Sequence, residues 1–158
     1  MPPIDDLREC ASCSCFAVRR AARVITQLYD RQMRSTGLRA TQFTVLVVLG
    51  LEGPLPLSVA ADRLGTERTT LTRNLRALIA RGLVTATPGE DRRVQMLAVT
   101  AKGIAAARAA LPQWRKAQRS IAGHFTAPTL GALNGAVQAA SRARSSGSGV
   151  SPGRKKEG

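Results

Sequence analysis

The stretch from Thr66 to Val99 constrains the fold most, because one amphipathic helix is followed directly by two short alternating segments. The apolar residues of the helix recur at helical spacing and share one face: Leu71, Leu75, Leu78 and Ile79. The segments LVTAT and VQMLAVT alternate around the basic tip PGEDRR, which is typical of a β-hairpin. We therefore expect a helix that packs by one face and leads into a hairpin with a charged turn.

The opposite face of this helix has short hydroxyls and guanidinium groups but no large apolar side chain. Its residues are Thr66, Thr69, Thr70, Arg73 and Ala77, with Arg76 at the edge. Such a face can enter a DNA major groove, where arginine reads guanine edges and threonine offers a hydroxyl and a methyl group. The alternative is an ordinary solvated helix face, and the helix by itself does not separate the two.

The charge balance predicts an anionic partner. Lys and Arg number 24 and Asp and Glu number 10, which gives a formal net charge of +14 at pH 7. Nucleic acid is the expected partner. A membrane surface is the weaker alternative, because no apolar run reaches the roughly 18 residues of a spanning helix. Aromatic residues make up only 3% of the chain, so a core of Ala, Leu, Val and Ile favours a mainly helical fold.

Other function classes have little support in the sequence. The N-terminal segment MPPIDDLREC is acidic and lacks the apolar core of a secretion signal, which predicts a cytoplasmic protein with reduced thiols. One His, scattered acidic residues and no Gly-rich phosphate loop leave no nucleophile–base pair. We therefore expect no enzyme activity, no catalytic residue, no cofactor and no bound metal.

Helix and turn signals organise the chain into one domain, residues 12–144, between two tails. Residues 1–11 are expected to be a flexible arm, and the Ser/Gly-rich basic segment 145–158 to be disordered. Within the domain, a short helix, a glycine turn and a longer helix form a helix-turn-helix at 57–81. The hairpin at 83–99 follows it as a wing.

The helices at 12–35 and 100–144 exceed what a small winged domain needs for its own core. The second region repeats apolar residues at heptad spacing: Ile104, Ala107, Leu111, Trp114, Ile121 and Phe125, with the polar Gln118 among them. Pro112 within it should kink or split the helix. We expect these terminal helices to form a homodimer; the alternative is that they pack only within the monomer.

At this point the chain resembles a known family. The segments GLRATQFTVLVVL, LSVAADRLGTERTTLTRNLRALIARGLV and GEDRRVQMLAVTAKG look like the MarR family of winged helix-turn-helix regulators. The most specific match is in the wing, where Asp91 and Arg93 form the D-x-R motif, followed by Thr100 and Gly103 as T-x-x-G. The resemblance covers roughly residues 13–142. It implies a mainly α, winged helix-turn-helix fold with a small β-hairpin wing and terminal dimerisation helices.

The resemblance also implies which residues contact double-stranded DNA. The recognition helix corresponds to residues 66–81, and its first residue, Thr66, is expected to contact DNA. Thr69 and Arg73 are expected at base edges. Phosphate contacts are expected from Arg68, Thr70, Thr72, Asn74 and Arg76. In the wing, Arg92 and Arg93 are expected at the minor groove or the adjoining backbone.

Asp91 in the wing has two interpretations. Its carboxylate can hold the Arg93 guanidinium through charge-assisted hydrogen bonds. It can equally be a plain turn former, since Asp suits turns.

Three cysteines, Cys10, Cys13 and Cys15, lie just before or within the first turn of the first helix. A helix N-terminus lowers the pKa of a thiol, and the stretch from Cys15 resembles the start of peroxide-sensing members of the same family. Three interpretations stay open: inert cysteines, redox sensors that form a disulfide, or metal ligands, for which no nearby His completes a set.

Together these observations predict a sequence-specific DNA-binding transcription regulator. The resemblance implies a dimeric repressor on a pseudo-palindromic operator, released by a small-molecule effector or by thiol oxidation. The alternative from a different class is a non-specific basic nucleic-acid-packaging protein that binds through charge alone.

Overall fold

The structure, a computed structural model, describes residues 5–146. The chain forms two compact units, the first ending at Ala117 and the second beginning at Gln118, so the boundary lies within a long helix, α5 (Ala101–Ile121). None of the helices in the described range is long and apolar enough to cross a membrane.

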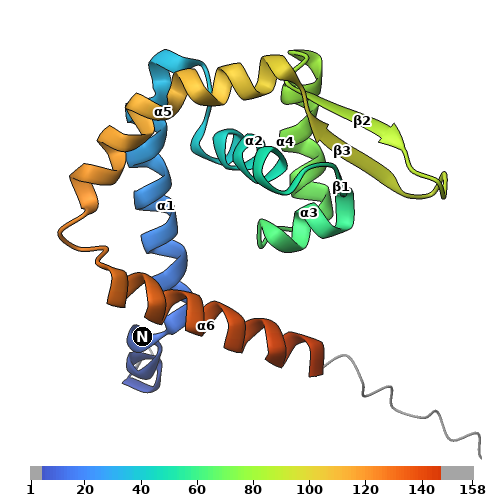
Figure 1. Cartoon of the computed structure of the whole chain (residues 1–158). Coiled ribbons are helices and arrows are strands. Elements are labelled where there is room, and N and C mark those ends of the chain that lie inside the picture. The colour runs from blue at the N-terminus through green and yellow to red at the C-terminus, as the bar shows by residue number, and fades with distance from the viewer. Residues whose placement is uncertain (1–4, 147–158) are drawn as a thin grey trace, which may run out of the picture. The chain divides into compact units, whose positions relative to one another are not determined.

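The first unit is built from helices and a small sheet (Figure 1). Before α5, its elements in chain order are η1 (Asp5–Ser12), α1 (Ser14–Met33), η2 (Arg34–Thr36), α2 (Ala40–Glu52), β1 (Leu55–Pro56), α3 (Leu57–Arg63), α4 (Arg68–Ala80), β2 (Val84–Pro88) and β3 (Gln95–Val99). The sheet is antiparallel with the order β1-β3-β2. The mainly α fold with a small hairpin wing is therefore confirmed.

The strand β1 is an addition to the predicted hairpin. Leu55 pairs with Leu97 and Pro56 with Met96. The sequence identifies this segment, EGPLP, only as a break after the second helix, because two residues are too few to show alternation.

The core of the first unit is aliphatic, as the composition predicts. Its fully buried large side chains come from α1, α2, α4, the turn before β2 and the sheet: Met33, Leu46, Leu49, Leu71, Leu78, Leu83, Val84 and Leu97. Burial of each such side chain contributes about 1.5–3 kcal/mol. Ile79, expected on the buried face of the recognition helix, is 40% exposed instead.

Several of the helices end at a glycine whose backbone adopts the left-handed conformation, which is strained for a residue with a side chain. Gly37 follows η2 with φ 68°, Gly65 lies between α3 and α4 with φ 60°, and Gly82 follows α4 with φ 68°.

The start of α2 is capped from another helix. The local sequence offers Thr41 as the capping residue, but the helix begins at Ala40, and the Asp30 carboxylate of α1 accepts the Ala40 N–H at 2.7 Å. Gln42 Oε1 also accepts the Arg39 N–H at 3.1 Å. A cap supplied from ten residues upstream has no local sequence signal, which is why it was missed.

The N-terminal arm also differs where it is described. Residues 5–12 form the 3₁₀ helix η1 rather than an irregular segment. Residues 1–4, and residues 147–158 of the tail predicted to be disordered, lie outside the described residues.

The helix α5 runs through Pro112, so of the two predicted effects of this proline, a kink or a split, the split is wrong. Its buried residues are Gly103, Ala110 and Ala117, spaced by seven. Leu111 and Trp114, placed in the predicted dimer seam, pack against the monomer core. Trp114 stacks on Phe43 of α2, with ring centroids 6.1 Å apart.

The second unit consists of the end of α5 and α6 (Ala127–Ser146). Thr126 precedes α6, and its hydroxyl lies 3.0 Å from that of Thr129. The apolar residues Leu130, Leu133 and Val137 of α6 are 42%, 41% and 55% exposed.

Candidate nucleic-acid interface

The recognition helix α4 is fixed by its buried face. Leu71, Leu75 and Leu78 are at most 2% exposed. The Gly65 turn holds the start of the helix against α3, where Thr66 N donates to Ala61 O at 3.0 Å. With one side of the helix immobilised, the orientation of its outer side chains is set by the core of the domain.

The outer face of α4 forms a shallow hollow of about 320 Å³. Its lining residues are Arg68, Thr69, Thr72, Arg73 and Arg76. Three of these are arginines, and within residues 5–146 none of the three has an acidic partner. A helix with this polar, cationic and unobstructed face has the size and chemistry to enter a major groove.

Five of the eight helix residues predicted to contact DNA thus lie together. Thr70 is exposed but outside the hollow, and both Thr66 and Asn74 are half-buried. Arg68, which falls toward the apolar side by helical angle, is exposed and lines the hollow. Since Arg68 begins α4, its long side chain can reach round the first turn to the outer face.

The two threonines of the hollow differ in how free they are. Thr72 Oγ1 donates to the carbonyl of Arg68 at 2.8 Å, so its proton is used within the helix. Thr69 makes no side-chain hydrogen bond in the described part of the chain. Thr69 can therefore donate to a base edge or a phosphate, whereas Thr72 can only accept or present its methyl group.

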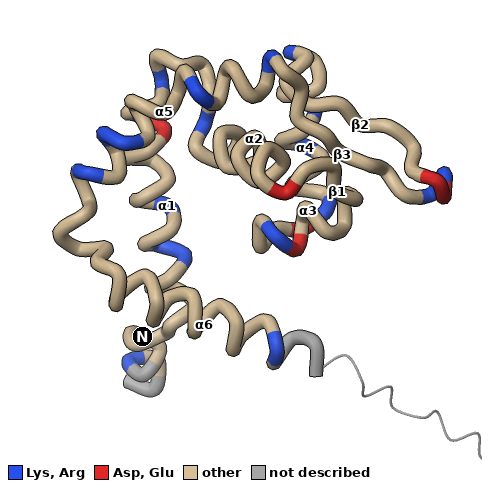
Figure 2. The backbone as a smooth tube through the Cα atoms, in the orientation of Figure 1, with Lys and Arg blue, Asp and Glu red and all other residues tan. Residues whose placement is uncertain are grey.

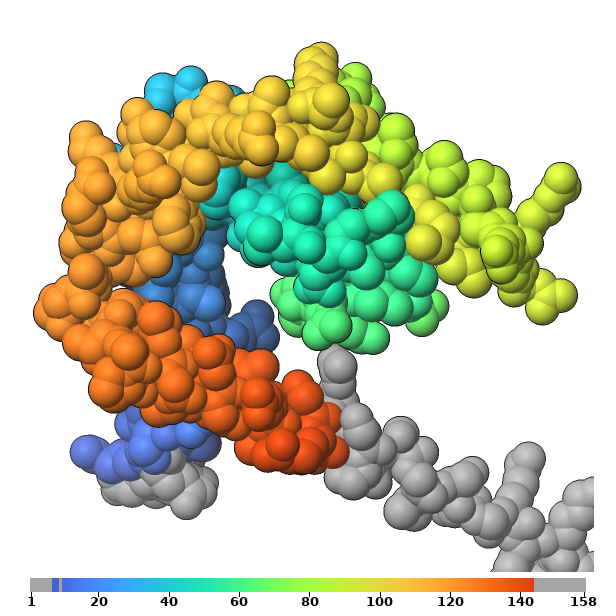
Figure 3. Space-filling view, viewed as in Figure 1, coloured from blue at the N-terminus to red at the C-terminus, as the bar shows by residue number. Residues whose placement is uncertain are grey.

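The wing is the hairpin of β2 and β3, and it projects from the body of the first unit (Figure 3). Its tip is closed by Gly89 N, which donates to Val94 O at 2.7 Å. Arg92 and Arg93 are exposed at this tip, next to the acidic pair Glu90 and Asp91 (Figure 2).

Asp91 orders the wing tip through the backbone. Its Oδ1 accepts the Arg93 N–H at 2.9 Å, and its carbonyl accepts the Val94 N–H at 2.8 Å. Of the two interpretations of Asp91, this geometry is that of the turn former. The Arg93 guanidinium is left available to an external anion.

The T-x-x-G motif joins the recognition helix to α5. Thr100 Oγ1 donates to Gly82 O at 2.7 Å and accepts the Gly103 N–H at 3.0 Å, so Thr100 caps α5 as predicted. The Thr100 N–H donates to Leu83 O at 3.1 Å. One threonine therefore ties the end of α4 and the first strand of the wing to the start of α5.

Two cations at the same junction were not predicted as functional residues. Arg81, the C-cap of α4, donates through Nη1 to Gly37 O at 2.8 Å, and Lys102 Nζ donates to Arg81 O at 2.9 Å. Their positions at the end of a helix and in the first turn of the next give no signal of these partners, which lie 44 residues from Arg81 and 21 residues from Lys102.

The cysteines lie at the other end of the unit. Cys10, Cys13 and Cys15 are free and exposed, and Cys13 is the N-cap residue of α1. The Cys13 N–H donates to Cys10 O at 3.1 Å, which places these two residues on the same turn of backbone.

Comparison with known proteins agrees with this geometry. The MarR family profile matches residues 36–94, which include the helix-turn-helix and most of the wing. The crystal structure of the M. tuberculosis transcriptional regulator MosR in complex with DNA is 40% identical, covering 84% of this chain and 99% of that one, with a TM-score of 0.77. The chain belongs to the MarR family.

Two further matches extend the comparison. A second M. tuberculosis MosR structure is 38% identical, covers 89% of this MarR-family chain and 99% of its own, and has a TM-score of 0.72. The Bacillus subtilis protein YwoH, an uncharacterized HTH-type transcriptional regulator, is 30% identical over 83 residues. That match covers 52% of this chain and 61% of YwoH.

Proposed function

We propose that this MarR-family chain is a sequence-specific DNA-binding transcription regulator that acts as a homodimeric repressor. The observation that carries the proposal is the hollow of α4, in which Thr69 and Arg73 lie between further arginines above a buried leucine face. Arg73 presents its guanidinium to guanine and Thr69 presents a free hydroxyl, while Arg68 and Arg76 neutralise phosphates. A protein with this role works in the cytoplasm, where a bacterial chromosome lies.

The wing adds a second contact in this proposal. Arg92 and Arg93 extend from a tip whose backbone is ordered by Asp91, so they reach the phosphates or the minor groove beside the recognition helix. Because they read charge rather than base identity, they raise affinity for all sequences.

A dimer follows from the need to present two recognition helices one turn of DNA apart. Large apolar side chains are exposed on α1, namely Phe16, Val18 and Val24, and on α6, namely Leu130, Leu133 and Val137. Exposed apolar surface of this kind is expected to be covered in a stable assembly. Pairing of these helices with a second copy covers it and favours a pseudo-palindromic operator.

Regulation is proposed to act through the spacing of the two DNA-binding units. A small molecule or a change at the exposed thiols shifts the population toward a spacing that no longer fits adjacent major grooves. A peroxide can oxidise the Cys15 thiol to sulfenic acid, and the peroxide is reduced to the alcohol or to water. A second thiol then forms a disulfide with loss of water.

Selection of bound duplexes from a random pool tests the proposal. The expected result is enrichment of one pseudo-palindromic sequence, bound at least roughly 10³-fold more tightly than bulk DNA. The non-specific packaging protein, the alternative from a different class, predicts binding through charge without enrichment. A pool that stays random after several rounds excludes the regulator.

A further inference from the structure

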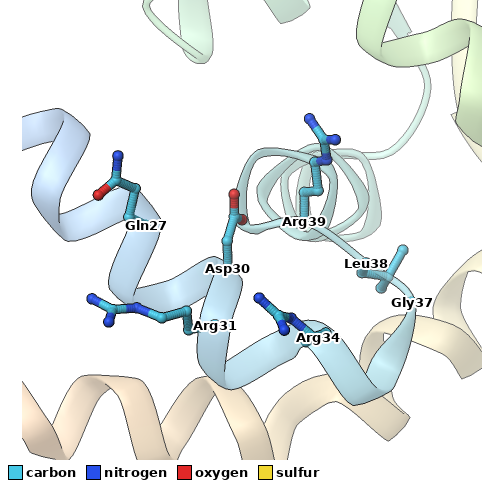
Figure 4. Close-up of a pocket in the computed structure, with 7 residues that line it drawn as sticks. All are labelled: Gln27, Asp30, Arg31, Arg34, Gly37, Leu38 and Arg39. Atoms are coloured by element: carbon cyan, nitrogen blue, oxygen red, sulfur yellow. The ribbon is translucent and has the colours of Figure 1, made fainter.

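A second hollow of the first unit lies where α1 ends and α2 begins, and the DNA-binding proposal does not use it. Its volume is about 760 Å³, within the range of small-molecule sites. Asp30 and Arg31 of α1, Arg34 of η2 and Arg39 at the start of α2 line it, together with Gly37. Figure 4 shows Asp30 and Arg39 extending to the same side of this junction.

The hollow is strongly cationic. Its lining has three arginines and a single acid, Asp30, whose Oδ1 already accepts the Ala40 N–H at 2.7 Å. Within residues 5–146, Arg31, Arg34 and Arg39 have no ion-pair partner. Arg39 is also the N-cap of α2, so the positive end of that helix dipole adds to the field. Three arginines and one acid leave an excess of two positive charges, which a ligand with two negative charges would balance.

The rim of the hollow is connected to the recognition helix. The Gly37 carbonyl accepts the hydrogen bond from Arg81 Nη1 at 2.8 Å, and Arg81 is the residue that ends α4. An added β-carbon on Gly37 would lie 3.6 Å from Arg81 Nη2, so both guanidinium nitrogens are beside this turn. An oxyanion bound next to Gly37 would compete for Arg81, because a carboxylate or phosphate can accept two parallel hydrogen bonds from a guanidinium and adds the attraction of a full negative charge, which the neutral Gly37 carbonyl lacks.

We propose that this hollow binds a small oxyanion with at least two negative charges, a phosphate ester or a polycarboxylate. Arg31, Arg34 and Arg39 hold the anion, and Arg81 leaves the Gly37 carbonyl to join them. The end of α4 is thereby released from the α1–α2 turn, and affinity for DNA falls. The effect on DNA rests on the proposed function, whereas the binding of the anion does not.

The site is separate from the DNA-reading hollow. Arg81 follows Arg68 by thirteen residues and Arg76 by five, which is about 20 Å and about 8 Å along a helix. No residue lines both hollows, so an anion held by Arg31, Arg34 and Arg39 does not occupy the face that reads DNA. The comparison of wild type with Arg81→Met described below separates an effect through α4 from direct repulsion between the anion and DNA.

Calorimetric titration of the full chain with citrate, and separately with inorganic pyrophosphate, tests the site without DNA. Wild type is expected to bind at least one of them with a Kd of ~1 mM or tighter. The double variant Arg34→Gln/Arg39→Gln should bind at least about tenfold more weakly, because the loss of even one charged contact is expected to weaken binding by about tenfold. The citrate and pyrophosphate arms distinguish the polycarboxylate from the phosphate source.

The matched control is Arg19→Gln, which removes an exposed positive charge from α1 outside the hollow. If wild type binds neither anion, or if Arg19→Gln weakens binding as much as the double variant does, the site does not exist.

Binding to the selected operator, measured with and without the anion at constant ionic strength, tests the coupling. The anion should weaken DNA binding about 5- to 20-fold, within the usual range of allosteric coupling. Arg81→Met should still bind the anion through Arg31, Arg34 and Arg39, though more weakly because the fourth contact is lost. With the anion at a concentration that saturates this variant, its DNA affinity should respond little. Equal responses of Arg81→Met and wild type would overturn the route through Arg81.

Two other outcomes are distinct from these. A chain that binds the anion but selects no operator contradicts the proposed function and leaves the anion site standing. A double variant that loses DNA affinity in the absence of any anion, with no change in anion binding, identifies Arg34 and Arg39 as DNA contacts and overturns the proposal.

Discussion

The α-carbon of Gly103 packs so closely against the backbone carbonyl of Leu83 that a β-carbon there would overlap the oxygen. Gly103 lies in the first turn of α5, and Leu83 follows the turn that ends the recognition helix. Their contact fixes where α5 leaves the DNA-binding part of the first unit. The glycine of the T-x-x-G motif is required by this close approach of two backbones.

Gly103→Ala is therefore expected to destabilise the protein by about 1–3 kcal/mol, or to shift α5, because the obstacle is backbone and cannot rotate away. Urea unfolding followed by circular dichroism measures the loss. Gly50→Ala in α2 is the matched control, since an added β-carbon there has no neighbour within 4 Å and alanine favours a helix. Equal stability of Gly103→Ala and Gly50→Ala would contradict the close contact.

Arg73→Ala is expected to cost about 1–3 kcal/mol of binding free energy at one operator base pair and to relax the preference there. The measurement compares affinities for the operator and for its single-base variants. Arg76→Ala, from the next turn of the same hollow, should weaken binding to every sequence alike. A uniform loss with Arg73→Ala would reassign that residue to the phosphates.

In the wing, Arg93→Ala should lower affinity for all duplexes and reduce the slope of log K against log salt by about one. Asp91→Ala should weaken DNA binding as well, because Arg93 N loses the acceptor that orders the tip. Asp91→Asn keeps a side-chain oxygen for that N–H and should bind nearly as wild type does. Binding isotherms at several salt concentrations check both variants, and a strong defect in Asp91→Asn would show that the charge matters.

Asp30→Ala is expected to cost about 0.5–2 kcal/mol of stability, since it removes the acceptor for the first N–H of α2. Asp30→Asn should retain most of it. Thermal or urea unfolding measures the difference, with Asp62→Ala on the exposed side of α3 as a control that also removes one carboxylate. Indistinguishable midpoints for Asp30→Ala and Asp62→Ala would mean that solvent replaces the cap.

Peroxide treatment is expected to release operator DNA from wild type and not from Cys15→Ser. The exposed thiol can be oxidised without prior unfolding. Gel-shift titration with an organic peroxide, followed by reduction with dithiothreitol, measures the response and its reversal. If Cys15→Ser responds as wild type does, the sensor lies elsewhere, and Cys10→Ser and Cys13→Ser identify it.

Several parts of this molecule follow from local pattern. The leucines of α4 are spaced for one face, and the three helix-ending glycines stand where only the left-handed conformation fits. The alternation of the hairpin gave its two strands. Each of these signals lies within a few residues of the structure it specifies.

The parts that were missed depend on partners far along the chain. Asp30 caps a helix that begins ten residues later, and Arg81 reaches the carbonyl of Gly37. Trp114, which fits a heptad seam, packs on Phe43 instead, because apolar spacing does not say whether the partner is the same chain or a second copy. The sequence likewise shows that Arg34 and Arg39 are charged, but it does not show that they line one hollow.

The stacking of Trp114 on Phe43 has a practical consequence. Trp114 is the only tryptophan of the chain, so emission excited at wavelengths that Tyr29 does not absorb comes from one half-buried indole at the junction of α2 and α5. Any ligand or modification that moves these two helices apart will change the wavelength and yield of that emission. The chain thus contains its own optical reporter, and rearrangement in the first unit can be followed in real time without a label.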